Sequence, residues 1–119
     1  MKGDERLFII IRKATSVFFR IRITDEKNNI VLLRDTDKLF FTVKKNPDNE
    51  MEQPIIRRVL TAEDELEGCY GFELTPADTD KPAGTYYYDA GVQRENGELY
   101  RIITPDQFLI KQSVTRKDD

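Results

Sequence analysis

The sequence predicts an all-β fold, a Greek-key β-sandwich of about eight or nine strands with one short helical corner. Three observations carry this prediction. Short runs in which hydrophobic and polar residues alternate recur along the chain, and turn-forming residues separate them. No stretch has the longer periodicity of an amphipathic helix. Residues 74–90 have the composition of a strand, a one-turn corner and a second strand.

The corner begins at Thr75 and Pro76. A threonine hydroxyl can cap the first turn of a helix, and proline at the first helical position already has the φ angle that a helix needs. Pro82 and Gly84 end any helix after about one turn, because proline lacks the amide hydrogen and glycine favours other conformations. The chain is therefore expected to turn once here and to continue as a strand.

The strand after the corner, residues 85–93, is rich in aromatic residues, and Tyr86 and Tyr88 share one of its faces. In immunoglobulin-like domains a tyrosine at such a corner returns its hydroxyl to the backbone a few residues upstream, which locks the crossing between the sheets. Tyr86 occupies that position, and Tyr88 stands where antibody domains have a cysteine. We therefore expect an immunoglobulin-like sandwich whose corner is formed by Thr75, Pro76, Asp78, Gly84, Tyr86 and Tyr88.

Alternation assigns the remaining strands and is clearest in residues 17–24. The run 7–11 lacks alternation, which indicates burial on both faces or an edge covered by a partner. We interpret the acidic segment 62–68 as a loop and Asn96-Gly97 as a two-residue hairpin turn that pairs Glu95 with Glu98. The expected strands are 7–11, 17–24, 30–33, 39–44, 55–61, 69–74, 85–93, 99–104 and 108–114, with an exposed loop at 46–50 and a break at Pro105-Asp106.

The length of 119 residues predicts a single domain over residues 1–119, in which 115–119 form a frayed tail. No apolar run approaches the roughly 20 residues of a membrane span, and the short apolar run near the start lacks the features of a signal sequence. We therefore expect a cytoplasmic protein without membrane contact. A net charge of −3 argues against nucleic-acid binding, for which only Arg20 and Arg22 on one strand face would be suited.

Few residues could carry catalysis or bind a metal. The chain has no histidine, and its only cysteine, Cys69, is interpreted as a small buried hydrophobic residue. Paired carboxylates could bind calcium, but we interpret them as turn-forming and capping residues, because they lack the spacing of a calcium loop. The sequence therefore predicts no enzyme activity, no cofactor and no metal site. The carboxylates considered are Asp35/Asp37, Asp78/Asp80 and Glu63/Asp64/Glu65/Glu67.

Three aromatic residues are out of phase with the apolar sets of their strands. Phe18, Phe40 and Tyr87 are expected to point outward if the alternating apolar residues line the core. Exposed aromatic residues on neighbouring strands would form a patch suited to protein contacts or, together with Tyr100, to stacking on sugars. We expect these three residues to belong to an assembly interface. The alternative is that loops cover them or that the assumed phase of the strands is incorrect.

The order of several motifs resembles that of the small immunoglobulin-like domain of tailed bacteriophages and of prophages of Gram-positive bacteria. That domain type is found at the N-terminus of baseplate upper proteins and in related short tail or tail-fibre proteins. The resemblance covers almost the whole chain and is most specific in residues 74–89. The motifs are Gly3-Asp4, Phe41-Thr42-Val43-Lys44, Leu74-Thr75-Pro76-x-Asp78-Thr79, Gly84-x-Tyr86-x-Tyr88-Asp89, Arg101-Ile102-Ile103-Thr104, Phe108-x-Ile110 and Val114-Thr115.

The resemblance implies a virion structural protein of the tail or baseplate, which acts through protein contacts and without catalysis or cofactor. Its partners would be other phage tail or baseplate proteins, with homo-oligomers as a further option and neither nucleic acid nor membrane. It would lie in the host bacterial cytoplasm during assembly and then in the virion. The alternative function is that of a carbohydrate-binding or adhesin-like immunoglobulin module at a cell surface.

Overall fold

The structure is a computed structural model that describes residues 9–112, except for the side chains of residues 103–105. The expected tail 115–119, the Gly3-Asp4 and Val114-Thr115 motifs and the first two residues of the expected strand 7–11 lie outside the described residues. The elements are the strands β1 (Ile9–Arg12), β2 (Val17–Ile21), β3 (Lys38–Lys44), β4 (Ile56–Leu60), β5 (Glu65–Leu66), β6 (Cys69–Leu74), β7 (Gly84–Gln93) and β8 (Leu99–Lys111), the 3₁₀ turn η1 (Ala62–Asp64) and the helix α1 (Pro76–Thr79).

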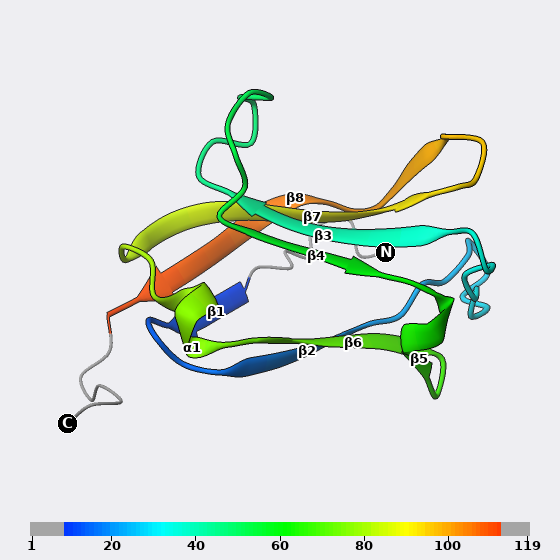
Figure 1. Ribbon diagram of the computed structural model, residues 1–119, viewed down its shortest axis with the longest axis horizontal. Helices are drawn as coiled ribbons and strands as arrows, with labels where there is room; N and C mark the ends of the chain where they lie inside the picture. Colours follow the sequence, from blue (N-terminus) through cyan, green and yellow to red (C-terminus); the bar gives the residue numbers. More distant parts are fainter. Residues whose placement is uncertain (1–8, 113–119) are drawn as a thin grey trace.

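The strands form two sheets that pack face to face (Figure 1). One sheet has the strand order β1-β8-β7-β3-β4, and the other has the order β2-β6-β5. The chain changes sheet between β1 and β2, between β2 and β3, between β4 and β5, and between β6 and β7, which makes the connections of Greek-key type. This is the predicted immunoglobulin-like sandwich, in which β1 pairs in parallel with β8 and all other pairs are antiparallel.

The core lies between the sheets and is filled by the alternating apolar residues that the sequence pattern predicted. In β3, β6 and β7 every second side chain is buried, because successive side chains of a strand point to opposite faces. At the centre, the rings of Phe19, Phe41, Phe72, Tyr88 and Phe108 form a continuous series with centroid separations between 4.9 and 6.3 Å. Aromatic residues from both sheets thereby hold the two layers together.

The expected strand 30–33 is not formed. Its backbone contributes one isolated bridge between Thr24 and Ile30 and one hydrogen bond from Val31 N to Ile23 O. The amide of Leu33 instead donates to the hydroxyl of buried Tyr70 at 2.7 Å. A side chain therefore satisfies a backbone group that the sequence pattern assigned to a sheet.

The predicted break at Pro105 is also wrong, because β8 continues from Leu99 to Lys111. Proline is tolerated here because the β7–β8 ladder changes register between Tyr88 and Ala90, and Pro105 lies in the irregular part. An irregular ladder spares the missing amide hydrogen.

Three smaller expectations need correction. Segment 62–68, expected as a loop, contains the turn η1 and the short strand β5. The β7–β8 hairpin has a three-residue connection, in which Gly97 N donates to Arg94 O and Arg94 N donates to Glu98 O. Gly97 has a φ of 91°, as the bulged form of hairpin requires. Of the two alternatives for the run 7–11, burial on both faces is wrong for the described part of β1, since Ile10 is exposed and Ile11 is buried. Strand β1 lies at the edge of the five-stranded sheet, and its coverage by a partner stays a prediction. No helix in residues 9–112 is long and apolar enough to cross a membrane.

Candidate functional site

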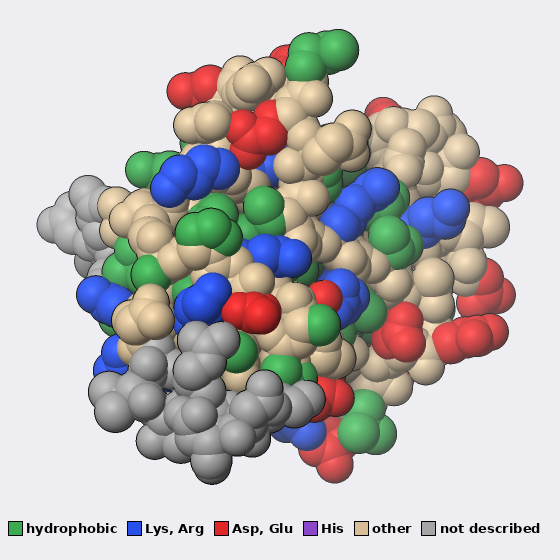
Figure 2. Space-filling view, turned by 60° about the vertical axis from the view of Figure 1, so that its left-hand side comes forward, with side chains coloured by type: hydrophobic (Ala, Val, Ile, Leu, Met, Phe, Trp, Pro, Cys, Tyr) green, Lys and Arg blue, Asp and Glu red, His purple; other side chains and the backbone are tan. Residues whose placement is uncertain are grey.

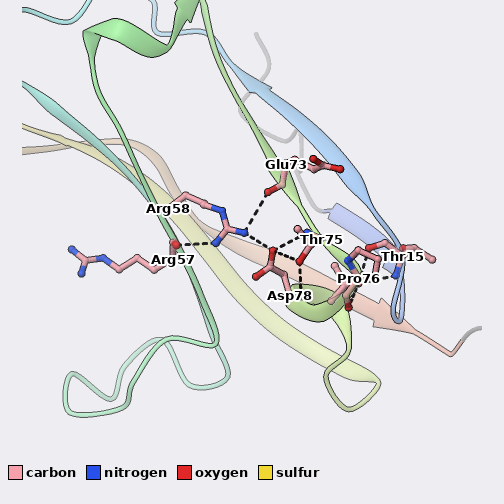
Figure 3. Close-up of polar contacts among 8 residues, drawn as sticks. Thr15, Arg57, Arg58, Glu73, Thr75, Pro76 and Asp78 are labelled. Atoms are coloured by element: carbon pink, nitrogen blue, oxygen red, sulfur yellow. Dashed lines mark hydrogen bonds and ion pairs between the residues drawn. The ribbon is translucent and has the colours of Figure 1, made fainter. Parts of the chain in front are cut away.

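The helical corner forms as the sequence predicted (Figure 3). Thr75 caps α1, and its Oγ1 accepts a hydrogen bond from Asp78 N at 3.3 Å. In return, Asp78 Oδ2 accepts from Thr75 N at 2.7 Å. Pro76 occupies the first helical turn, where no amide donor is needed. The sequence Thr-Pro-x-Asp thus encodes both halves of a capping box.

The corner is tied to the opposite sheet by Arg58 of β4, a contact that the sequence analysis missed. The Arg58 guanidinium forms an ion pair with Asp78 and donates to the carbonyl oxygen of Glu73 at 3.3 Å. Figure 3 shows that the neighbouring Arg57 extends away from this cluster. Burial raises the pKa of Asp78, but hydrogen bonds from Thr75 and the charge of Arg58 outweigh it and hold that pKa below its usual range.

Thr79, at the end of α1, anchors the corner to the β1–β2 connection. Its side chain is fully buried, accepts from Thr15 N at 2.8 Å and donates to Thr15 O at 2.7 Å. Two hydrogen bonds to one residue leave little freedom between these segments. The corner therefore joins α1 and the adjacent strand β6 to β4 and to the β1–β2 connection, which are both more distant in the chain.

The corner tyrosine behaves as predicted. Tyr86 is buried, and its hydroxyl donates to Pro82 O at 2.8 Å, four residues upstream. Tyr88 is also buried and packs against Phe41 and Phe108. Gly84 begins β7 opposite Ile110. These residues stabilise the fold, and the hydroxyl of Tyr86 is already used within the corner.

The three aromatic residues expected at an interface do not lie on one surface. Phe18 is 63% exposed on β2, and its ring lies over Gly71 on the outer face of the three-stranded sheet. Phe40 of β3 and Tyr87 of β7 are half-buried on the outer face of the five-stranded sheet. Strand β2 is not a neighbour of β3 or β7, so the expected single patch is not formed. The interface role of each residue remains a prediction.

The outer face of the five-stranded sheet carries a shallow hollow of about 520 Å³ near Phe40. Gly91 lies opposite both Phe40 and Arg101 in the ladders, and a Cβ at this position would lie 3.1 Å from the carbonyl oxygen of Tyr100 and 3.5 Å from Leu99 Cδ1. The guanidinium of Arg57 lies 4.9 Å from the centroid of the Phe40 ring. Figure 1 shows that the β3–β4 loop and the β7–β8 hairpin rise on this outer side. The hollow is therefore an apolar floor with arginines beside it.

Asp89 lies in the same hollow, where its carboxylate is 3.3 Å from Nε of Arg101. Burial raises the pKa of Asp89 above its usual range, although the charges of Arg101 and Lys44 lower it in part. A half-buried carboxylate with one charged partner is suited to a polar contact with an incoming group.

A buried ion pair at the base of the β7–β8 hairpin was also missed. Asp37, interpreted from the sequence as a turn former, is 1% exposed and lies 2.5 Å from Nη1 of Arg94. Its Oδ2 also accepts from Arg34 N at 2.8 Å, while Oδ1 has no hydrogen-bond partner among the described residues. The signal available in the sequence was only the turn preference of aspartate, and this does not reveal a partner 57 positions away.

The other candidate residues are spread over the structure. Asp64 and Glu65 accept hydrogen bonds from the backbone amides of Thr61 and Gly68, as the capping interpretation predicted. Asp80 lies 3.0 Å from Nζ of Lys13. Cys69 is half-buried, not buried as expected. In residues 9–112 no three histidine, cysteine or acidic residues are grouped so that they could hold a metal ion.

Exposed apolar residues are distributed over several parts of the surface. The face seen in Figure 2 shows hydrophobic side chains singly or in small groups among basic ones, while acidic side chains lie mainly toward its right, upper and lower edges. The large exposed hydrophobic residues are Ile10, Phe18, Ile30, Leu32, Met51, Val59, Leu66, Leu99 and Tyr100.

A comparison of the chain with known protein families finds no matching family, and a comparison with curated proteins finds no matching sequence.

Proposed function

We propose that this chain is a structural component of a phage or prophage tail or baseplate, which acts through protein contacts and without catalysis or cofactor. One observation carries the proposal. The motif order in residues 74–89, the most specific part of the resemblance, coincides with the corner that joins the two sheets. The resemblance therefore rests on residues that determine the fold and not on scattered surface positions.

The surface supports a role in contacts with other proteins. Phe40, Val59 and Leu99 place apolar groups on one face of the five-stranded sheet, and arginines stand beside them. Protein interfaces are enriched in aromatic residues and arginine relative to the remaining surface. The partners proposed are other tail or baseplate proteins. The chain would be made in the host bacterial cytoplasm and then be incorporated into the virion.

The alternative is a carbohydrate-binding or adhesin-like module at a cell surface. Tyr100, the aromatic residue considered for sugar stacking, is 50% exposed. However, its ring faces the guanidinium of Arg94 at 5.8 Å, and its hydroxyl donates to Glu98 at 2.7 Å. A sugar would have to compete with both contacts. The geometry therefore favours protein contacts over glycan binding.

The composition of phage particles tests the proposal. A lysogen that carries the gene is induced, particles are purified on a density gradient, and the chain is quantified by mass spectrometry and located by immunogold microscopy. We expect a constant number of copies per particle and gold at the tail. An abundant cytosolic host protein measures carry-over. If the chain stays with the free proteins while complete particles form, the proposal is wrong. Binding of the purified chain to a defined class of oligosaccharide on a glycan array would favour the alternative.

A further inference from the structure

The hollow on the five-stranded sheet has the features of a socket for an acidic, apolar projection. We define the socket by Phe40, Arg57, Gly91, Leu99 and Arg101. Its apolar floor is accessible, since Leu99 is 63% exposed and Gly91 has no side chain. Arg57 stacks on Phe40 and has no carboxylate within ion-pair distance among the described residues. A stacked guanidinium keeps its edge free, and that edge can bind a carboxylate with two hydrogen bonds.

The segment from η1 through β5 to the β5–β6 turn has the complementary features and is here called the knob, defined by Glu63, Leu66 and Glu67. Leu66 is 63% exposed at the end of β5, and both glutamates are exposed. Neither glutamate forms an ion pair with a described residue. Residues 59–80 contain seven acidic residues and no lysine or arginine. The knob thus offers an exposed apolar side chain close in sequence to two exposed carboxylates, which have no cationic partner in residues 9–112.

The socket and the knob cannot meet within one copy. The socket faces outward from the five-stranded sheet, whereas the knob belongs to one end of the three-stranded sheet (Figure 1). We propose that the knob of one copy inserts into the socket of a second copy. Leu66 then covers the Phe40–Leu99 floor, and the glutamates approach Arg57, because Arg101 is already paired with Asp89 in the same hollow. Charge complementarity and mutual apolar burial both favour this occupant over an unrelated one.

This contact uses two different surfaces, so it is of the head-to-tail type. Such contacts produce closed rings or open filaments, because each bound copy still presents a free knob or a free socket. The inference does not depend on the proposed phage function, since it concerns only the association of the chain with itself.

The test is the association of the full chain, measured by sedimentation equilibrium and light scattering over a range of concentrations. The socket variant carries Arg57→Glu and Leu99→Ser, and the knob variant carries Glu63→Lys and Leu66→Ser. Each variant is expected to raise the concentration for half-association at least about tenfold, because each removes a charge pair and an apolar contact. Raising the ionic strength from about 0.05 to about 0.5 M should also weaken association of the natural chain.

A mixture of the two variants gives the decisive readout. The socket variant retains an intact knob, and the knob variant retains an intact socket. One copy of each can therefore form a single contact, and the mixture should yield a 1:1 heterodimer that does not grow further. This gain of association also shows that both variants are folded.

The matched control replaces an arginine and an exposed apolar residue of strand β1, outside both the socket and the knob, Arg12→Glu and Ile10→Ser. It should associate as the natural chain does. A natural chain that stays monomeric up to millimolar concentration would overturn the proposal. So would a control that dissociates while the socket variant does not, or a knob variant that still forms dimers by itself, which would indicate a face-to-face contact.

Discussion

The hydroxyl of Tyr86 donates a hydrogen bond to the carbonyl oxygen of Pro82 across the end of the helical corner, at 2.8 Å. This bond connects the start of strand β7 to the segment that leads into it. Because Tyr86 itself is 4% exposed, its ring is held in the core while its hydroxyl fixes the crossing between the sheets.

Replacing Tyr86 by Phe should lower the free energy of unfolding by about 1 kcal/mol, since the ring is retained and one partly buried hydrogen bond is lost. The measurement is urea unfolding followed by circular dichroism. The control is Tyr87→Phe on the same strand, whose half-buried hydroxyl forms no hydrogen bond with a described residue. Equal effects of the two substitutions would contradict the role assigned to the corner bond.

Replacing Arg94 by Met should destabilise the protein by about 3 kcal/mol or more, because the buried carboxylate of Asp37 would lose its charged partner. Thermal and urea unfolding at neutral pH measure this effect. The double variant Asp37→Asn with Arg94→Met leaves no buried charge and should recover part of the loss. A double variant that is less stable than Arg94→Met alone would argue against this explanation.

The lowered pKa of Asp78 predicts that the protein loses stability in acid. Its pKa is lower in the folded protein than the usual value of 3.8, so its ionised form stabilises the fold. That contribution is complete above the unfolded pKa and disappears as the pH falls through the folded pKa. The variant Asp78→Asn should therefore be less stable than the natural chain at pH 7, and the difference should shrink toward about pH 2. Unfolding curves at a series of pH values test this, and a constant difference would contradict it.

The raised pKa of Asp89 predicts a pH dependence of stability that is opposite to that of Asp78. Burial raises its pKa above 3.8 in the folded protein, so the ionised form is less favourable there than in the unfolded chain. Stability from this group is greatest below the unfolded pKa and decreases as the pH rises through the folded pKa. Asp89→Asn should therefore be more stable than the natural chain at pH 7 and of similar stability at low pH. A destabilised variant at neutral pH would indicate that the Arg101 contact outweighs burial.

Local features were predicted best. The strands with clear alternation, the capping box at Thr75 and the corner hydrogen bond of Tyr86 all depend on residues within about ten positions of one another. Segment 30–33 was assigned incorrectly, because a short apolar run does not reveal whether a strand partner or a side chain such as Tyr70 will satisfy its backbone. The continuous path of β8 through Pro105 was missed for a related reason: a proline is excluded only where a neighbouring strand needs its donor.

The sequence by itself determined the all-β class, the inward-facing residues of most strands and the helical corner, because these follow from side-chain alternation and from the backbone preferences of threonine, proline and glycine. Only the tertiary structure decided which outward-facing residues lie on the same surface and which charged residues form pairs. It placed Phe18 and Phe40 on opposite sheets, paired Arg58 with Asp78 and buried Asp37 against Arg94. Each of these relationships depends on how strands distant in the chain are ordered within and between the sheets, and local alternation carries no information about that order.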